Sequence, residues 1–463
     1  MERSHLPGTH SLIPTRSQAD ATASLCALSN TPALRALVQA LAPAQLYLVG
    51  GTVRDAFLES TKTDLDLATS LSAPEIKARC EKRGIKTVDT GIQHGTILVV
   101  IDGIHIEVTT FRVPSERESH TPAKDISTDL AGRDFTINAI AFDLDSKMLV
   151  DPLNGVVDIA AGTLRAVGDA SLRFAEDPLR VLRMVRFGPA QGRQVDAATL
   201  SAAKTLASSL QRVSPERIRT ELEAILMSSH PAEGVACIRE IGALPFTLPE
   251  LIPAIGFEQN RFHMHDVFEH TLWVLSRAAA DPILRWAALF HDIGKPHTLS
   301  VDDAGNRHFY LHEIVSEKLA RERMHALRFS RDDTETIASI VRHHMRPLDC
   351  GAPGVRRLMR DLGENLTRWR SFKEADSPPL TPELEFRVTA SSFDALLQIE
   401  RDRLAGPAYG KLAVTGEDLI ALGMKPGPSM GALLKELEEL VLDDPAWNEK
   451  EKLLAEAQKR LPR

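Results

Sequence analysis

The chain has 463 residues, of which 43% are hydrophobic, and a formal net charge of −8 at pH 7. This length is too great for one compact core and predicts two to four domains, and no apolar run approaches the roughly 20 residues of a membrane-spanning helix. The four cysteines form no C-x-x-C pair, which argues against a zinc ribbon or a disulfide framework and favours a reducing cytoplasm. The overall charge does not suggest a nucleic-acid partner, but arginine is dense between 165 and 219, and a local basic patch is sufficient for binding.

The first half of the chain begins with a polar segment and continues with mixed strand and helix patterns. Residues 1–30 lack the apolar core of a secretion signal, so we expect a mobile extension there. Strand patterns follow at 45–50, 63–69, 95–101 and 104–111, and helical patterns at 32–42 and 73–84. The mixture predicts a small α/β head domain over 31–165, with a mixed sheet and helices.

From about residue 170 the strand patterns vanish and helical periodicity takes over. We expect a helical neck over 166–232 and a histidine-rich helical domain over 233–376. A proline-rich break at 377–382 then leads into a C-terminal helical tail domain over 377–463. The fold class is therefore an α/β head followed by an all-α body.

Acidic residues gather near the second predicted strand. Asp64 and Asp66 are two residues apart, so a strand would direct both carboxylates to one position, where their repulsion is relieved by cations. Taken alone, the pair would be better explained as a solvated acidic turn. Glu107 leaves the core face of the strand in which Ile104, Ile106 and Val108 alternate, and it is the candidate third carboxylate, with a structural surface acid as an equal alternative.

The segment after Gly51 resembles the nucleotidyltransferase superfamily, in which a glycine pair precedes two acids separated by one residue. Gly50 and Gly51 carry no side chain that would keep a phosphate from the backbone amides. The resemblance implies that Arg54 contacts a triphosphate. It also implies that Asp64 and Asp66 hold two Mg²⁺ ions, which bridge the triphosphate and lower the pKa of an attacking hydroxyl.

Two longer motifs are more specific. The stretches "GRDFTINAIAFD" (132–143) and "EDPLRVLRMVRF" (176–187) resemble the signature motifs of class II tRNA nucleotidyltransferases, the CCA-adding enzymes, and of bacterial poly(A) polymerases. The resemblance implies a neck that binds nucleotide and RNA, with tRNA, CTP and ATP as partners. It assigns nucleotide contacts to Arg133, Asp177, Arg180, Arg183 and Arg186.

The second motif also has a chemical rationale. Asp177, Arg180, Arg183 and Arg186 are spaced by three and are expected to form a stripe around one helix. Cytosine and adenine both present an amino donor beside a ring-nitrogen acceptor, whereas uracil and guanine present the reverse. A carboxylate only accepts and a guanidinium only donates, so Asp177 and Arg180 could select C and A without a nucleic-acid template. The resemblance assigns these roles to them and implies that Arg183 and Arg186 lie nearer the nucleotide and its phosphates.

The chain departs from the family pattern in two places. Gly132 stands where these enzymes usually have a first arginine before Arg133. The segment between Arg112 and Arg133 is also short and lacks the usual D-G-R-like run of a flexible loop that helps the site change from adding C to adding A. The sequence is therefore compatible with full CCA addition or with a CC-adding specialist.

The histidine-rich region resembles the HD family of metal-dependent phosphohydrolases. Imidazole and carboxylate groups together suit a divalent transition metal that activates water for attack on a phosphoester. The candidate ligands are His270, His291, Asp292, His312, His343, His344 and Asp376.

These features predict a cytoplasmic, magnesium-dependent tRNA nucleotidyltransferase that adds C and A to tRNA 3′ ends, together with an HD phosphohydrolase activity and no membrane partner. A bacterial poly(A) polymerase is the main alternative. A third hypothesis makes the head a nucleotide sensor and the HD domain the only enzyme.

Overall fold

The computed structural model describes residues 15–58, 65–91, 95–112, 123, 125–259, 266–377, 383–404 and 411–460. The chain divides into two compact units, which are described separately: residues 1–252 with 326–328, and residues 253–325 with 329–463. Among the described residues there is no helix long and apolar enough to cross a membrane.

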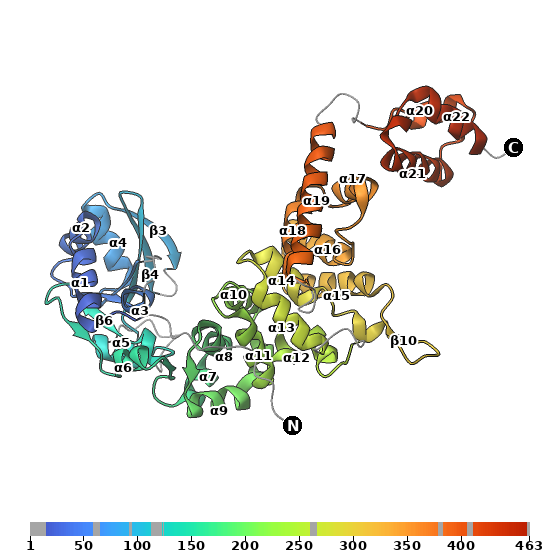
Figure 1. Cartoon of the computed structure of the whole chain (residues 1–463). Helices are drawn as coiled ribbons and strands as arrows, with labels where there is room; N and C mark the ends of the chain where they lie inside the picture. Colours follow the sequence, from blue (N-terminus) through green and yellow to red (C-terminus); the bar gives the residue numbers. More distant parts are fainter. Residues whose placement is uncertain are drawn as a thin grey trace. The chain divides into compact units, whose positions relative to one another are not determined.

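A mixed sheet forms the centre of the head within the first unit (Figure 1). It has seven strands in the order β3-β4-β5-β2-β1-β6-β7. The strands are β1 (Leu46–Val49), β2 (Leu65–Thr69), β3 (Lys86–Gly91), β4 (Thr96–Ile101), β5 (Ile104–Thr110), β6 (Ala141–Asp143) and β7 (Leu149–Val150). Of the strand pairs, β2 and β5 are parallel and the others antiparallel. The four predicted strands are confirmed, whereas β3, β6 and β7 were not predicted. The edge strand β3 is polar ("KTVDTG") and has no apolar alternation to reveal it.

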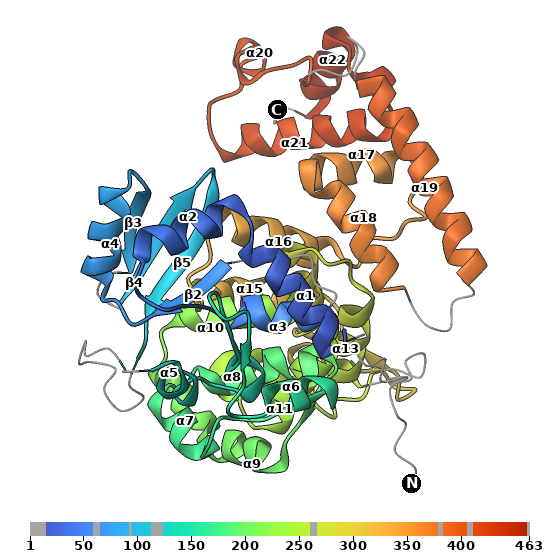
Figure 2. The ribbon, with the colours of Figure 1, turned by 90° about the vertical axis from the view of Figure 1, so that its left-hand side faces the viewer.

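Six helices accompany this sheet in the described part of the head. They are α1 (Gln18–Ser29), α2 (Pro32–Leu41), α3 (Gly51–Phe57), α4 (Ala73–Lys82), α5 (Ile126–Ala131) and α6 (Gly155–Ala160). The capping box of Ser72 and Glu75 begins α4, which packs against β3, β4 and β5 (Figure 2). The expected mobile extension over 1–30 is wrong for α1, which buries Ala21 and Leu25; residues 1–14 lie outside the described part of the chain.

The neck continues the first unit with short helices. They are α7 (Ala170–Glu176), α8 (Arg180–Phe187), α9 (Ala197–Leu206), α10 (Pro215–Leu226), α11 (Pro231–Glu240) and α12 (Leu244–Thr247). Ser214 caps α10 by accepting a hydrogen bond from the Arg217 backbone, with Pro215 in the first helical position, as predicted. The expectation that strands end before residue 170 is wrong in detail, because β8 (Thr163–Leu164) pairs with β9 (Gln194–Val195).

In its described residues the second unit is helical apart from a small hairpin, β10 (Ser300–Val301) and β11 (Arg307–His308). Its helices are α13 (Val267–Arg277), α14 (Pro282–Phe290), α15 (His312–Ala326), α16 (Arg331–His343), α17 (Gly351–Leu362), α18 (Leu366–Ala375), α19 (Glu383–Leu404), α20 (Gly416–Ala421), α21 (Pro428–Asp443) and α22 (Lys450–Arg460). Trp286 and Trp369 are among the largest fully buried side chains of its core. The predicted fold class, an α/β head with an all-helical body, is confirmed, while the finer domain boundaries stay predictions.

Candidate active sites

The first candidate site begins with two acids on neighbouring strands. Asp66 of β2 and Glu107 of β5 are paired in register in the parallel part of the sheet. Paired residues of adjacent strands project to the same face, so the structure brings Glu107 beside Asp66, as the strand alternation predicted. Glu107 is exposed and Asp66 is half-buried. Asp64, the other predicted acid of the pair, lies outside the described residues.

The glycine turn closes against this acidic edge. Gly50 has φ 60°, and a Cβ placed there would lie 3.0 Å from Arg133 Nη1 and 3.6 Å from Asp66 Oδ2. A Cβ on Gly51 would lie 3.7 Å from both Asp66 Oδ2 and Arg54 Nη2. The left-handed φ and the tight contact with Arg133 favour glycine at position 50, whereas at Gly51 a Cβ would make only ordinary van der Waals contacts. Four predicted features, the glycine pair, Asp66, Arg54 and Arg133, meet at one place.

Both arginines at this place are held by the protein. Arg54 donates to Asn138 Oδ1 (Nη1, 2.8 Å) and to Asp55 Oδ1 (Nε, 2.9 Å). Arg133 donates to Asp129 Oδ2 through Nε and Nη2 (3.2 and 3.0 Å) and to the Asn138 carbonyl (3.3 Å). Their guanidinium groups are thus oriented before any anion arrives, which reduces the entropy lost on binding.

The predicted stripe of Asp177 with three arginines on one helix is wrong in one respect. Asp177 lies between α7 and α8, with extended backbone angles (φ −144°, ψ 98°), and α8 begins only at Arg180. The reason is Pro178, because proline disfavours a helical conformation in the residue before it. The Asp177 carboxylate accepts from Arg217 Nη2 at 3.2 and 3.1 Å, a contact with α10 that the sequence did not indicate.

Arg180 is buried in contacts with the protein, unlike a residue that reads a base in an open pocket. Its side chain is only 4% exposed and donates to the Gly132 carbonyl (2.9 Å), the Arg173 carbonyl (3.1 Å) and Glu176 (3.0 Å). In this structure the guanidinium therefore connects α8 to Gly132 of the head and to α7. The Gly132 carbonyl that it binds belongs to the residue that departs from the family pattern.

Arg183 and Arg186 lie on one side of α8 and are neutralised by buried acids. Arg183 contacts Asp134 Oδ2 through Nε (2.8 Å) and Nη2 (2.6 Å), and Arg186 Nη1 lies 3.3 Å from Glu221 Oε2. Burial acts to raise the pKa of Asp134, but the charge of Arg183 and hydrogen bonds from Asn138 and Arg183 outweigh it and lower that pKa to about 2. At Glu221 burial outweighs the nearby arginines, so its pKa is raised.

Phe187 lies within this group of cations. The guanidinium carbons of Arg186, Arg54 and Arg183 lie 4.2, 4.9 and 5.2 Å from the centre of its ring. Cation–π contacts of this kind hold the guanidinium groups over an apolar surface. The described head and neck therefore carry several guanidinium groups near the glycine turn and Asp66, a suitable electrostatic environment for a polyanion.

Replacing Glu221 by alanine is expected to lower the free energy of unfolding of the first unit by about 3 kcal/mol, because one acid of a buried charged group is removed and Arg186 loses its partner. Glu223→Ala, on the same helix but beside Arg219 at 3.7 Å and partly exposed, is the matched control and should change it by less than about 1 kcal/mol. Urea unfolding followed by circular dichroism measures both. Equal midpoints for the two variants would contradict this role of Glu221.

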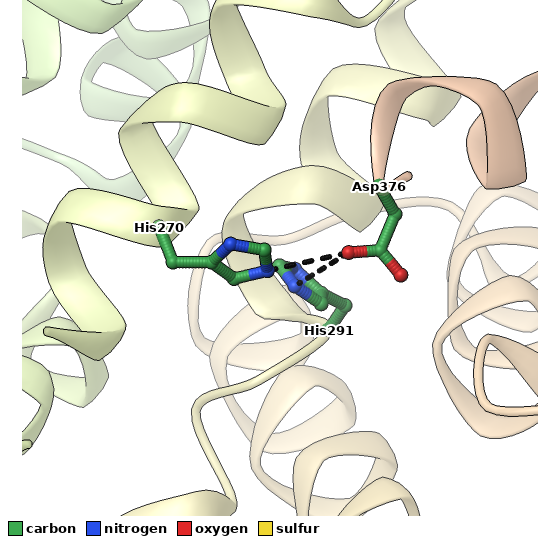
Figure 3. Close-up of side chains that lie close together, drawn as sticks. All are labelled: His270, His291 and Asp376. Atoms are coloured by element: carbon green, nitrogen blue, oxygen red, sulfur yellow. Dashed lines mark ion pairs between the residues drawn. The ribbon is translucent and has the colours of Figure 1, made fainter. Parts of the chain in front are cut away.

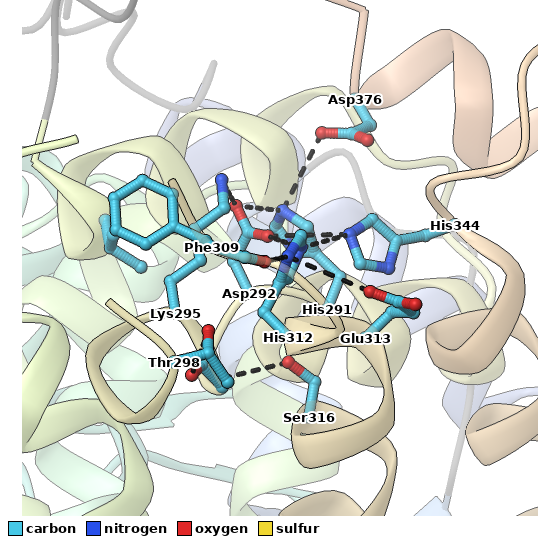
Figure 4. A network of polar contacts seen from close by, with 12 residues as sticks. His291, Asp292, Lys295, Thr298, Phe309, His312, Glu313, Ser316, His344 and Asp376 are labelled. Atoms are coloured by element: carbon cyan, nitrogen blue, oxygen red, sulfur yellow. Dashed lines mark hydrogen bonds and ion pairs between the residues drawn. The ribbon is translucent and has the colours of Figure 1, made fainter. Parts of the chain in front are cut away.

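The second candidate site is a buried cluster of histidines and aspartates in the second unit (Figures 3 and 4). One group contains His270, His291 and Asp376, in which Asp376 Oδ1 lies 3.3 Å from His270 Nε2 and 3.7 Å from His291 Nε2. The other contains Asp292, His312 and His344, in which Asp292 Oδ1 lies 3.2 and 3.5 Å from the two Nε2 atoms.

Asp292 joins the two groups. Its second oxygen, Oδ2, lies 3.2 Å from His291 Nε2 and 3.6 Å from His270 Nε2. Burial acts to raise the pKa of Asp292, but the charges of His291 and Lys295 hold it well below its usual range. A single carboxylate therefore faces four imidazole rings, an arrangement that a shared ligand of two metal positions would have.

Backbone carbonyls orient three of the imidazole rings. The Nδ1 atoms of His291, His312 and His344 lie 2.9, 2.7 and 2.7 Å from the carbonyls of Ala288, Phe309 and Val341. Such a contact fixes the proton on Nδ1 and turns the Nε2 lone pair inward. His291 Nε2 and Asp292 Oδ1 are also buried without a well-aligned hydrogen bond. The set of nitrogen and oxygen donors fits a divalent transition metal.

One predicted ligand is corrected and one neighbour was missed. His343 lies outside both groups, with its Nε2 4.0 Å from Asp361 Oδ2, and His344 occupies the cluster instead. Lys295 was not predicted, although it follows Asp292 by three residues. Its ammonium donates to Asp292 Oδ2 and to Gln259 Oε1, both at 2.7 Å.

Comparisons with known proteins identify the domains in which the two candidate sites lie. Residues 46–165 match the Poly A polymerase head domain, 193–255 the probable RNA and SrmB-binding site of polymerase A, 267–377 the HD domain, and 391–457 a tRNA nucleotidyltransferase domain 2. An A-adding tRNA nucleotidyltransferase from Deinococcus radiodurans is 33% identical over 414 residues, which are 86% of this chain and 91% of the relative.

Two CCA-adding enzymes extend this comparison. The enzyme from Leuconostoc mesenteroides is 30% identical over 407 residues, which are 86% of this chain and 88% of the relative. The crystal structure of the Bacillus stearothermophilus enzyme in complex with CTP has a TM-score of 0.69 and 26% identity, and the alignment covers 93% of this chain and 98% of that one. The chain therefore belongs to the tRNA nucleotidyltransferase family that contains the CCA-adding and A-adding enzymes.

Proposed function

We propose that the head is a template-independent tRNA nucleotidyltransferase that adds C, and then A, to the 3′ end of tRNA from CTP and ATP. The observation that supports this most is the pairing of Asp66 and Glu107 beside the glycine turn, together with Arg54 and Arg133. The 3′-hydroxyl of the RNA attacks the α-phosphate, the bond to the β-phosphate breaks, and pyrophosphate leaves with the electron pair.

The carboxylates of Asp64, Asp66 and Glu107 would hold two Mg²⁺ ions, which lower the pKa of the attacking hydroxyl and neutralise the triphosphate when bound. Gly50 and Gly51 admit the phosphates to the backbone, and Arg54 and Arg133 donate to them. Arg183 and Arg186 add positive charge from α8. The role of Asp64, which lies outside the described residues, rests on the sequence spacing alone, and the other roles rest on the contacts described above.

Base selection is proposed to lie at Asp177 and Arg180. Asp177 offers only acceptors to the amino group shared by cytosine and adenine. Because Arg217 binds this carboxylate and Arg180 is buried in protein contacts, both side chains would have to exchange partners when the base enters. Asp177 and Arg180 would give up contacts with the protein for contacts with the base. A base that lacks an amino donor beside a ring-nitrogen acceptor would leave their buried charges unpaired, so cytosine and adenine are favoured.

The range of addition is settled by an extension assay. Three tRNA transcripts, one without the CCA end, one ending in C and one ending in CC, are incubated with Mg²⁺ and CTP, ATP or both. We expect two cytidines and one adenosine. Addition of A alone to the CC-ended transcript would make the protein resemble its A-adding relative, and arrest after CC would make it a CC-adding specialist. The short segment 113–122, on which this choice partly depends, lies outside the described residues. A long adenosine ladder on any RNA would contradict the proposal and favour a poly(A) polymerase.

A second function is proposed for the HD cluster, because its six donors fit a divalent transition metal. His270, His291, Asp292 and Asp376 would hold one ion, and Asp292, His312 and His344 a second. The metal would supply a hydroxide from bound water at neutral pH. In the hydrolysis, the water oxygen bonds to phosphorus, the ester P–O bond breaks, and the leaving oxygen takes a proton. Lys295 would hold Asp292 in position. The four cysteines, all free thiols, agree with a cytoplasmic location for both activities.

A further inference from the structure

A stacked pair of aromatic rings lies directly before one of the proposed metal ligands. The hairpin of β10 and β11 ends at His308, Tyr310 follows two residues later, and His312 follows after two more. Tyr310 is 71% exposed, the highest value among the large hydrophobic side chains of the described residues. Its ring is parallel to that of His308, with an interplanar angle of 7° and 5.2 Å between the ring centres.

The ring pair is held in place by Asp302, which contacts His308. His308 Nε2 lies 3.0 Å from Asp302 Oδ2, and the other oxygen of Asp302 accepts from the backbone amides of Ala304 and Asn306. One face of Tyr310 thus rests on an oriented ring while most of its side chain is open to solvent. An aromatic side chain fixed in this way loses little entropy when a further ring stacks on it.

The chain turns sharply between this pair and the metal cluster. Leu311 has φ +61° although it is not glycine, and its side chain is 62% exposed. The left-handed conformation is strained for leucine, and burial of its side chain does not compensate. Strain of this kind is often kept at functional positions. The turn sets His312 at the start of α15, where its ring faces the Phe309 carbonyl.

The same stretch contacts the cluster on its inner side. Phe309 lies between His308 and Tyr310 in sequence, and its ring centre is 5.9 Å from the Lys295 ammonium, which donates to Asp292 (Figure 4). Tyr310 and His312 are two residues apart, so their Cα atoms are at most about 7 Å from each other. The backbones of Tyr310 and His312 are therefore separated by about the length of one nucleotide, from base to phosphate.

We propose that Tyr310, supported by His308, is a base-stacking platform that makes the HD cluster specific for nucleotides, in particular for phosphate esters at RNA ends. The inference rests on the proposed phosphohydrolase. Every nucleobase has an extended apolar face, so any of the bases can stack on an aromatic side chain. Leu299, Val301 and Ile314, which are close to this stretch in the sequence, are also exposed apolar side chains.

The test compares the wild-type full-length protein, Tyr310→Ala and Tyr310→Phe. Binding of adenosine 3′-monophosphate and of glycerol 3-phosphate, which has no base, is measured by calorimetry, and hydrolysis of adenosine 2′,3′-cyclic phosphate by steady-state kinetics. Tyr310→Ala should weaken nucleotide binding and raise KM roughly tenfold with kcat unchanged. Tyr310→Phe should restore both values, and glycerol 3-phosphate should bind all three proteins equally. CTP addition to tRNA should also be unchanged, which shows that the head site is intact.

Several results would overturn the platform. They are unchanged nucleotide binding in Tyr310→Ala, an equal loss for glycerol 3-phosphate, or failure of Tyr310→Phe to restore binding. Sedimentation velocity is measured on the same proteins. If the sedimentation coefficient were the only property that Tyr310→Ala changed, the surface would instead be a contact between copies of the chain. If the wild type hydrolyses no ester, the phosphohydrolase proposal fails, and the binding experiment with nucleotide still decides the platform separately.

Discussion

Asp66→Asn is expected to lower the rate of nucleotide addition to tRNA about a thousandfold. An enzyme that depends on bound metal loses several kcal/mol of transition-state stabilisation when one of the metal ligands is removed. Asparagine keeps the shape of the side chain and the hydrogen bond from the Asp66 backbone to Thr52 Oγ1 (2.8 Å), so the fold of β2 is retained. Only the charge that faces the glycine turn is lost. Single-turnover extension of a tRNA transcript measures the effect.

Two controls make this result specific. Asp89→Asn changes an exposed acid of the same sheet, on β3, which pairs with Lys77, and should leave the rate within about twofold of wild type. The HD activity of Asp66→Asn should equal that of the wild type. Retained addition in Asp66→Asn would contradict the proposed role of Asp66, whereas absence of nucleotide addition in the wild type would favour the hypothesis that the head is a nucleotide sensor.

Asp292→Asn is expected to abolish phosphohydrolase activity and to weaken metal binding at least about a hundredfold, because one carboxylate contributes to both groups of the cluster. The amide still accepts a hydrogen bond from Lys295, but it supplies no negative charge to four imidazole rings. The metal content of the purified protein, measured by mass spectrometry, and equilibrium dialysis against Mn²⁺ or Zn²⁺ give the change directly.

His343→Ala is the matched control for this change, since it removes an imidazole next to His344 that lies outside the cluster. It should keep the metal content and the activity of wild type, and both variants should add nucleotides to tRNA normally. Equal metal content in Asp292→Asn and wild type would contradict the metal site. Loss of metal in His343→Ala would contradict the choice of His344.

The sequence predicts the acids of the head site well because strand geometry is regular. Alternation along residues 104–111 is sufficient to turn Glu107 to the face opposite Ile106 and Val108, and β5 then places it beside Asp66. The prediction fails at Ile104, which alternates regularly but is exposed at the start of β5, and at the polar strand β3, which has no apolar alternation. Local periodicity thus predicts on which face of a strand a side chain lies, whereas the residue opposite it on the adjacent strand is determined by the pairing of the sheet.

The helical sites show the limits of the same reasoning. A spacing of three suggested one helix for Asp177 and the arginines, but the conformational effect of Pro178 breaks it. Glu221 and Arg217 could not be recognised, because only the packing of α10 against α8 brings them to Arg186 and Asp177. Between His343 and His344 the sequence had no basis for a choice, since adjacent residues at a helix end point in different directions, and tertiary contacts decide which one faces inward.

The central claim is that protein side chains select the base without a template. Its most direct test is the kcat/KM for single addition of each of the four nucleotides to tRNA ending in C or in CC. The account predicts CTP on the first transcript and ATP on the second, with UTP and GTP poorer by at least about 10³-fold, as expected when buried polar groups would be left unpaired. Comparable incorporation of all four nucleotides would contradict selection by the protein.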